Sequence, residues 1–138
     1  MASILVKDYM QANAQAVKST ASVREVIEHL LKAQVTGVAV INDEEQVVGF
    51  VSEQDCIKEM LNSTFYAAAS PPVTQIMTKD VLTVTPETSI LEVAETMTLH
   101  KPKNYPVVSQ GKLVGLISRR HVLQALIKND AGWFGCPH

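Results

Sequence analysis

Hydrophobic residues near the start of the chain recur at the spacing of one helix face. They occupy positions i, i+3, i+4, i+7 and i+8, namely Val23, Val26, Ile27, Leu30 and Leu31, and this period predicts an amphipathic helix. Ser22 and Glu25 have the spacing of a capping box, in which each side chain accepts a hydrogen bond from the other residue's backbone N–H. The pattern therefore predicts a helix that begins after Ser22 and buries one face.

The pattern then changes to short runs of β-branched residues. Residues 38–41 and 47–51 are such runs, and the polar segment between them supplies a turn, which together predict a β-hairpin. A second helix is expected over about 53–62, and a short extended stretch over 15–18 precedes the first helix. The first half of the chain is thus expected to fold as a β-α-β-β-α unit.

The second half of the chain repeats the first. A shift of 67 residues aligns Met10 with Met77, Val17 with Val84, Ser22 with Ser89, Glu25 with Glu92, Val26 with Val93 and Val40 with Val107. After a turn that is one residue shorter, a shift of 66 aligns Val48 with Val114, Gly49 with Gly115 and Ser52 with Ser118. The second copy is expected to contain an extended stretch at 81–85, a helix opened by Ser89, strands at 105–108 and 113–117, and a helix over 119–128.

The repeat predicts an α+β fold made of two β-α-β-β-α units. We expect residues 1–62 to form the first unit, 63–72 a linker, 73–128 the second unit and 129–138 a tail. A unit of about 60 residues buries little surface alone, and a small sheet needs a cover. The units are therefore expected to pack about a pseudo-twofold axis into one compact module, with helices covering the small sheets.

Composition narrows the class of protein. The 138 residues include 12 Lys and Arg against 14 Asp and Glu, for a formal charge of −2, and 46% are hydrophobic. These values favour a folded globule over a disordered chain or a binder of nucleic-acid backbone. No hydrophobic run is long enough to span a bilayer and no signal peptide is recognisable, so we expect a cytoplasmic protein. The two cysteines do not form a disulfide framework.

The segment from Ser52 to Asp55 is the most informative for function. It follows a strand and opens a helix, whose free N–H groups and dipole attract anions such as phosphate. A carboxylate in this position accepts hydrogen bonds from the vicinal hydroxyls of a ribose. Ser-x-x-Asp is equally the sequence of a helix cap that touches no ligand. Both interpretations are open at this stage.

The second copy departs from this pattern. Ser118 is followed by His121 where the first copy has Asp55. Arg119 and Arg120 lie between them, although the first turn of a helix disfavours cations. The two arginines indicate either a nearby anion or a solvated face.

The chain resembles a tandem pair of cystathionine-β-synthase (CBS) domains, the Bateman module, over about residues 4–128. The resemblance rests on the paired units, the entry segments Val6-Lys-Asp-Tyr-Met10 and Val73-Thr-Gln-Ile-Met77, the strand Tyr105-Pro106-Val107-Val108 and the motif Gly-x-x-Ser-x-x-Asp at Gly49 to Asp55. It implies a regulatory module that binds AMP, ADP or ATP, and less readily S-adenosylmethionine, in clefts between the units. It also implies a disc-shaped homodimer and a protein partner that responds to occupancy.

The resemblance also implies roles for individual residues. Asp55 would hold the ribose, Ser52 and Gln54 would lie near the phosphates, and the backbone of Asn104, Tyr105 and Pro106 would meet the adenine. By the same logic a second cleft would combine Thr36, Gly37 and Val38 with Lys103, Ser118, Arg120 and His121, helped by Lys101. Because His121 replaces the ribose-binding Asp, we expect this cleft to bind adenosine weakly or to prefer a phosphate-rich ligand.

The remaining cysteines and histidines indicate neither a catalytic site nor a metal site. Cys56 lies beside acidic residues in a helix start, so we expect an inert thiol. Cys136 and His138 supply too few ligands for a metal site, and His29 and His100 are expected at the surface or an interface. No catalytic set is recognisable, so we expect a binding module that needs no cofactor rather than an enzyme. The alternative is a ligand-free interaction module that works through its dimer or through the tail containing Trp133 and Phe134.

Overall fold

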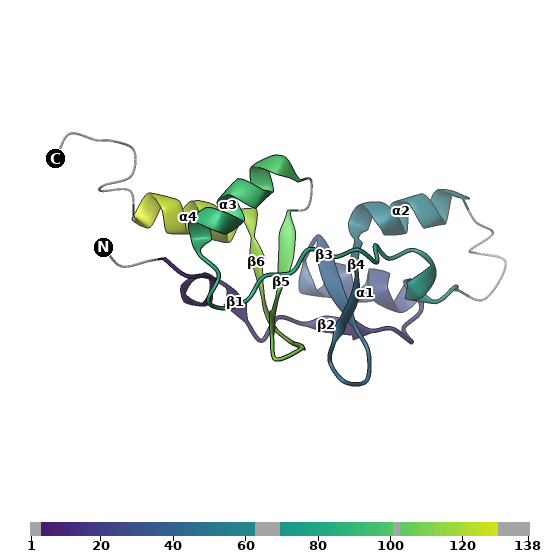
Figure 1. Ribbon diagram of the computed structural model, residues 1–138. Helices are drawn as coiled ribbons and strands as arrows, with labels where there is room; N and C mark the ends of the chain where they lie inside the picture. The colour runs from purple at the N-terminus through teal and green to yellow at the C-terminus, as the bar shows by residue number, and fades with distance from the viewer. Residues whose placement is uncertain (1–3, 63–69, 101–102, 130–138) are drawn as a thin grey trace. The chain divides into compact units, whose positions relative to one another are not determined.

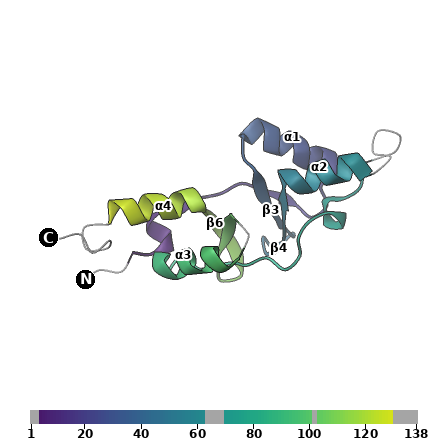
Figure 2. The same cartoon turned by 90° about the horizontal axis from the view of Figure 1, so that it is seen from above.

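The computed structural model describes residues 4–62, 70–100 and 103–129. The chain forms two compact units, shown in two views in Figures 1 and 2. The first unit comprises Gln15–Val81 with Gly111–Leu113, and the second comprises Met1–Ala14, Leu82–Gln110 and Val114–His138. The fold is α+β, as expected, with one small sheet in each unit.

The first unit has the predicted β-α-β-β-α order. In chain order it contains β2 (Ala16–Lys18), α1 (Val23–Ala33), β3 (Gly37–Ile41), β4 (Val47–Ser52), α2 (Glu53–Asn62) and the short 3-10 helix η3 (Val73–Gln75). β2 runs parallel to β3, and β3 pairs antiparallel with β4. In this register Val38 lies opposite Val51 and Val40 opposite Gly49. The two valines of β3 and Val51 pack in the same core as Val26 and Leu30 of α1.

The second unit is built from both ends of the chain. It contains η1 (Val6–Asp8), β1 (Gln11–Ala12), α3 (Ile90–Leu99), β5 (Asn104–Ser109), β6 (Lys112–Ser118) and α4 (Arg119–Lys128). β1 pairs antiparallel with β6, which also neighbours β5. The stretch expected to be extended at 81–85 forms only an isolated parallel bridge between Val84 and Val107. The hydrophobic core of the second unit contains Tyr105, packed together with Ile90, Val93, Val107 and Ile117.

The entry segments of the two repeats exchange places. Val6 N–H donates to Thr88 O at 2.9 Å, which ties the first entry segment to the start of α3. Val73 N–H donates to Ala21 O at 2.8 Å, which ties the second entry segment to the start of α1. The repeat ranges 1–62 and 73–128 follow the order of the sequence, whereas each compact unit takes its entry segment from the other repeat.

The two repeat-related helix starts are capped differently. Ser22 and Glu25 form the complete capping box of α1 that the sequence predicts. Ser89 caps α3 by accepting from Leu91 N–H at 3.1 Å, without a reciprocal bond from Ser89 N–H to the side chain of Glu92. Within the described residues, no helix has the length and hydrophobicity needed to cross a membrane.

Candidate functional site

Ser52 and Asp55 form reciprocal hydrogen bonds at the start of α2. Asp55 Oδ2 accepts from Ser52 N–H at 2.9 Å and from Ser52 Oγ at 3.0 Å, and Asp55 N–H donates to Ser52 Oγ at 3.2 Å. The capping interpretation of this motif is therefore realised in the structure. Both side chains are half-buried, whereas Gln54 between them is exposed.

The cap leaves part of the Asp55 carboxylate unused. Both bonds from Ser52 end on Oδ2, and Oδ1 accepts no hydrogen bond within the part of the chain that the structure describes. Since a carboxylate has about four acceptor sites, two on each oxygen, the two sites of Oδ1 remain for a ligand. Capping and ligand binding are thus compatible in this residue.

His121 caps α4 as Asp55 caps α2, but the atom that remains outside the cap is a hydrogen-bond donor in His121 and an acceptor in Asp55. Ser118 N–H donates to His121 Nδ1 at 3.0 Å, and Ser118 Oγ lies 3.0 Å from the same nitrogen. Nδ1 must be unprotonated to accept from a backbone N–H, so the ring is neutral and Nε2 carries the proton. Burial lowers the pKa of His121 below its ordinary value, which agrees with a neutral ring.

The two helix starts also differ in charge. Arg119 and Arg120 are exposed in the first turn of α4, and Arg119 N–H donates to Lys103 O at 3.0 Å, which brings the start of β5 beside them. The first turn of α2 instead carries the acidic residues Glu53 and Asp55. The basic group around Ser118 therefore suits an anion better than the start of α2 does.

The structure brings each candidate strand segment to the helix start of its own unit. Thr36 O accepts from Glu53 N–H at 2.9 Å, so the segment Thr36–Val38 begins beside Ser52, in the same way that Lys103 lies beside Ser118. Asp55 belongs to the first unit and Asn104 to the second. Their pairing across one ligand remains a prediction.

Two of the candidate adenine contacts are buried residues. Tyr105 is 0% exposed and Pro106 is also buried, so neither offers its side chain to solvent. The Tyr105 hydroxyl has no hydrogen-bond partner among the described residues, and burial raises its pKa. The contact that the resemblance implies here uses backbone atoms, which burial of the side chains permits.

The motif glycines have a packing role that sequence reasoning missed. A Cβ on Gly115 would lie 2.8 Å from both Gln11 O and Met10 Sδ, and one on Gly49 would lie 2.8 Å from Met77 Cγ and 3.0 Å from Thr78 O. Each glycine therefore admits the methionine of an entry segment. The sequence signal for this packing was that both the methionine and the glycine recur in the repeat, Met10 as Met77 and Gly49 as Gly115.

The other candidates divide into buried, exposed and undescribed residues. Cys56 is buried, and burial with the nearby charges of Asp55 and Glu53 raises its pKa to about 11, so the thiol is inert. His100 is exposed, whereas His29 is half-buried with a buried Nε2. No group of three potential metal ligands occurs in the described segments. Lys101, Trp133, Phe134, Cys136 and His138 lie outside the described residues.

Comparison with known proteins identifies what these motifs resemble. The sequence profile of the CBS domain matches residues 6–62 and again 73–128. The protein MJ1225 of Methanocaldococcus jannaschii is 31% identical over 121 residues, which are 88% of this chain and 42% of that protein.

Solved structures agree with this match. The structure of CBSX2 in complex with AMP has a TM-score of 0.79 and 30% identity, covering 91% of this chain and 97% of that one. The structure of CBSX2 from Arabidopsis thaliana has a TM-score of 0.80 and 29% identity, covering 92% and 96%. The similarity therefore extends over nearly the whole length of both chains.

Proposed function

The chain belongs to the CBS domain family as a tandem pair, and from this premise we propose that it is a regulatory module that binds an adenosine-type ligand at Ser52, Gln54 and Asp55. The observation that carries the proposal is the free Oδ1 of Asp55 at the start of a helix in the family's motif. Its support is the similarity to CBSX2, a chain of nearly equal extent solved with AMP.

In the proposed complex each part of the ligand meets matching chemistry. The ribose hydroxyls donate to the Asp55 carboxylate, as acidic residues do in dinucleotide sites. The phosphate lies near Ser52, Gln54 and the first turn of α2, whose N–H groups favour an anion. The adenine meets the backbone of the segment Asn104–Pro106, supplied by the second unit. The preferred nucleotide is AMP, ADP or ATP.

We propose a second, weaker site that offers a hydrogen-bond donor where the first site offers an acceptor. It combines Thr36, Gly37 and Val38 with Lys103, Ser118, Arg120 and His121. His121 presents an Nε2–H donor where Asp55 presents an acceptor, so it cannot accept hydrogen bonds from a ribose. A donor flanked by cations is suited to phosphate oxygens, and this site therefore favours the phosphate-rich part of a nucleotide.

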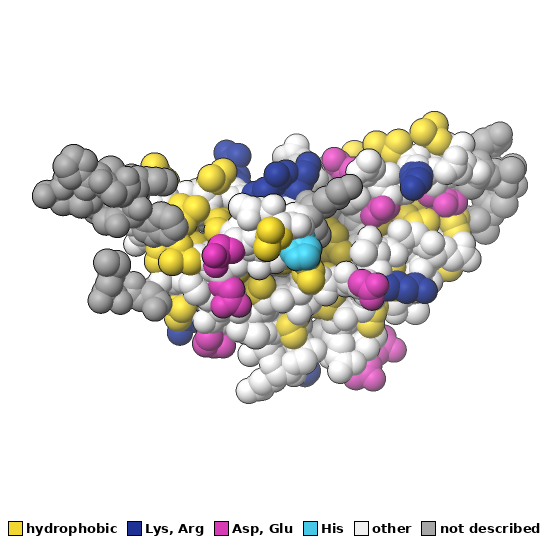
Figure 3. All heavy atoms as spheres, turned by 45° about the horizontal axis from the view of Figure 1, so that its top comes forward, with side chains coloured by type: hydrophobic (Ala, Val, Ile, Leu, Met, Phe, Trp, Pro, Cys, Tyr) yellow, Lys and Arg dark blue, Asp and Glu magenta, His cyan; other side chains and the backbone are white. Residues whose placement is uncertain are grey.

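The exposed faces of α2 and α4 support a homodimer as the working form. Ile57 and Leu61 of α2 are 58% and 80% exposed, and their repeat equivalents Leu123 and Ile127 of α4 are 65% and 64% exposed. Figure 3 shows hydrophobic side chains along the outer edge of α2, at the upper right of the view. Apolar positions that recur in both repeats suit an isologous contact with a second copy of the chain. Ligand occupancy would then act by favouring one arrangement of the dimer or of a bound protein partner.

A second candidate function follows from the caps themselves. Because Ser52 with Asp55, and Ser118 with His121, already satisfy helix ends, a ligand-free interaction module explains the same residues. Thermal unfolding with AMP, ADP, ATP and S-adenosylmethionine separates the two functions, because only a ligand that binds the native state raises the midpoint. No shift with any of them at millimolar concentration rejects the nucleotide site.

Calorimetry of an Asp55→Asn variant tests the site itself. The amide retains an oxygen for the cap but removes the charge that the ribose hydrogen bonds use, so affinity should fall about tenfold to a hundredfold. Asp43→Asn is the matched control, because Asp43 is an exposed residue of the β3–β4 turn. Equal affinity of the two variants would show that Asp55 serves only as a cap.

A further inference from the structure

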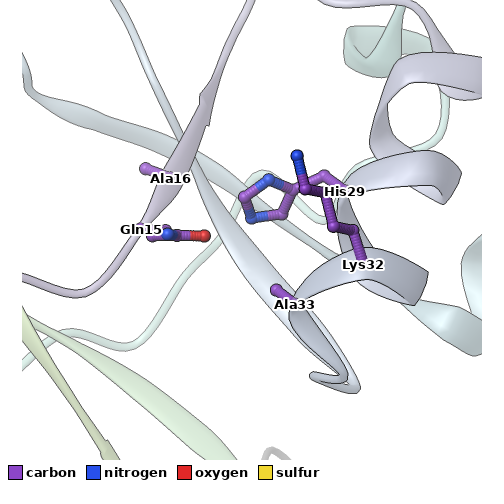
Figure 4. Close-up of a pocket in the computed structure, with 5 residues that line it drawn as sticks. All are labelled: Gln15, Ala16, His29, Lys32 and Ala33. Atoms are coloured by element: carbon purple, nitrogen blue, oxygen red, sulfur yellow. The ribbon is translucent and has the colours of Figure 1, made fainter.

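A polar pocket in the first unit involves none of the residues assigned to the nucleotide sites. It encloses about 510 Å³ and is lined by Gln15, Ala16, His29, Lys32 and Ala33. Figure 4 shows the Gln15 side chain, next to the edge strand β2, facing the His29 ring of α1 across the pocket, with the Lys32 amine beside the ring. Two small alanines complete the lining, which leaves the space between these polar groups open.

His29 provides the sign that this pocket has an occupant. Its Nε2 atom is buried and has no hydrogen-bond partner among the described residues. An unpaired polar atom removed from water is unfavourable, and native structures rarely leave one without a protein, water or ligand partner. A molecule in the pocket that bonds to Nε2 removes this cost.

We propose that the pocket binds a small oxyanion, the phosphate or carboxylate group of a solute. Lys32 supplies the opposite charge, and the Gln15 amide and His29 Nε2, in the tautomer that carries the ring proton on this atom, supply hydrogen bonds from two sides. His29 and Lys32 are three residues apart on α1 and so lie on the same face of the helix. Two of the groups come from α1 and the third from the residue before β2, so the anion is held between these two segments.

The electrostatics of the helix end make Lys32 the decisive group. Carbonyl groups in the last turn of a helix carry partial negative charge and disfavour an anion. Gln34 and Val35 both donate their backbone N–H to Leu30 O, which satisfies that carbonyl. The remaining unfavourable field must be overcome by the Lys32 ammonium, so its removal should abolish most of the affinity.

Solution NMR of the full chain tests the proposal with two probes, inorganic phosphate and acetate, titrated at constant ionic strength in sodium chloride. We expect saturable shifts of the His29 ring signals with at least one probe, and the two arms show whether phosphate or carboxylate is the group recognised. Lys32→Gln should weaken the binding about tenfold or more. Lys18→Gln is the matched control, because Lys18 is exposed at the end of β2.

Two results would overturn the proposal. The first is the absence of a saturable shift of the His29 ring with either probe, which would mean that water alone fills the pocket. The second is equal weakening by Lys32→Gln and Lys18→Gln, which would reduce the effect to general surface charge. Lys32 is exposed on the helix, so its variant is expected to remain folded and both results are interpretable.

Discussion

Ser118 and His121 are joined by a hydrogen bond from the serine backbone N–H to His121 Nδ1, 3.0 Å long. The equivalent bond in the other repeat runs from Ser52 N–H to Asp55 Oδ2 at 2.9 Å. The same cap is therefore made by an imidazole in one unit and by a carboxylate in the other. An imidazole can accept this bond only while Nδ1 is unprotonated, so the two caps respond differently to pH.

The first prediction is a loss of stability in mildly acidic solution. Burial lowers the folded-state pKa of His121 below 6.5, so between that pKa and 6.5 the unfolded chain binds more protons than the folded one. The contribution of neutral His121 is therefore fully present above pH 6.5, falls as the pH falls, and is lost below the folded pKa. Protonation also adds a third cation beside Arg119 and Arg120 at a helix start. Urea unfolding between pH 7.5 and 5 measures the loss.

A variant isolates this contribution from those of the other titrating groups. His121→Asn provides an amide oxygen that accepts from Ser118 N–H at every pH, so its unfolding free energy should depend less on pH than that of the natural chain. Every other ionisable group is the same in both chains and cancels in the difference. Identical pH profiles would show that His121 does not titrate through the cap.

The second prediction concerns the close approach at Gly115. Gly115→Ala should reduce the unfolding free energy by about 1–3 kcal/mol, the usual cost of overpacking. The new Cβ would lie 2.8 Å from Gln11 O, a backbone atom held by the pairing of β1 with β6. Urea unfolding of Lys112→Ala, at an exposed site on β6, provides the control. A neutral Gly115→Ala would mean that β1 leaves the sheet easily.

Most local elements were predictable from the sequence, but the stretch expected to be extended at 81–85 forms only an isolated bridge. The exchange of entry segments was not predictable. α2 and α4 span the residues expected for them, 53–62 and 119–128, because a cap and a hydrophobic period lie within a few residues of each other. Val6 and Val73 are both 0% exposed, and either placement would bury them. Which unit each entry segment joins depends on hydrogen bonds between residues far apart in the sequence, and no local sequence pattern predicts these bonds.

The residues of the candidate site were likewise predictable from the sequence, whereas the hydrogen bonds between them were not. The spacing of Ser52 and Asp55 identified both a cap and a ligand site, and the structure shows that one carboxylate oxygen makes the cap while the other is free. The sequence also marked His121 as a departure. Its tautomer follows only from the distance to Ser118 N–H, which requires the structure.

The third prediction compares two tyrosines of the second unit. Tyr105→Phe should leave stability unchanged or raise it by about 1 kcal/mol, because the Tyr105 hydroxyl is buried without a partner among the described residues. Tyr9→Phe should lower stability by about 0.5–1.5 kcal/mol, because Tyr9 Oη accepts from Asn129 Nδ2 at 2.8 Å. Chemical unfolding of both variants checks the contrast. A clear loss in Tyr105→Phe would reveal a bound water or ligand at that hydroxyl.

The last prediction rests on the proposed nucleotide site and concerns the start of α4. There a substitution of His121 replaces a hydrogen-bond donor by an acceptor. His121→Asp places a carboxylate where Asp55 lies in the other repeat, so the cap with Ser118 persists and a free acceptor replaces the Nε2–H donor. A carboxylate can accept the hydrogens of the ribose hydroxyls, which the Nε2–H of the imidazole cannot do, while Arg120 and Lys103 remain for the phosphate. Calorimetry should then detect an additional AMP per chain, and Asp55→Asn in the same chain should weaken binding at the original site about tenfold to a hundredfold. If His121→Asp keeps its unfolding midpoint but gains no AMP, the identity of this side chain does not decide ribose binding.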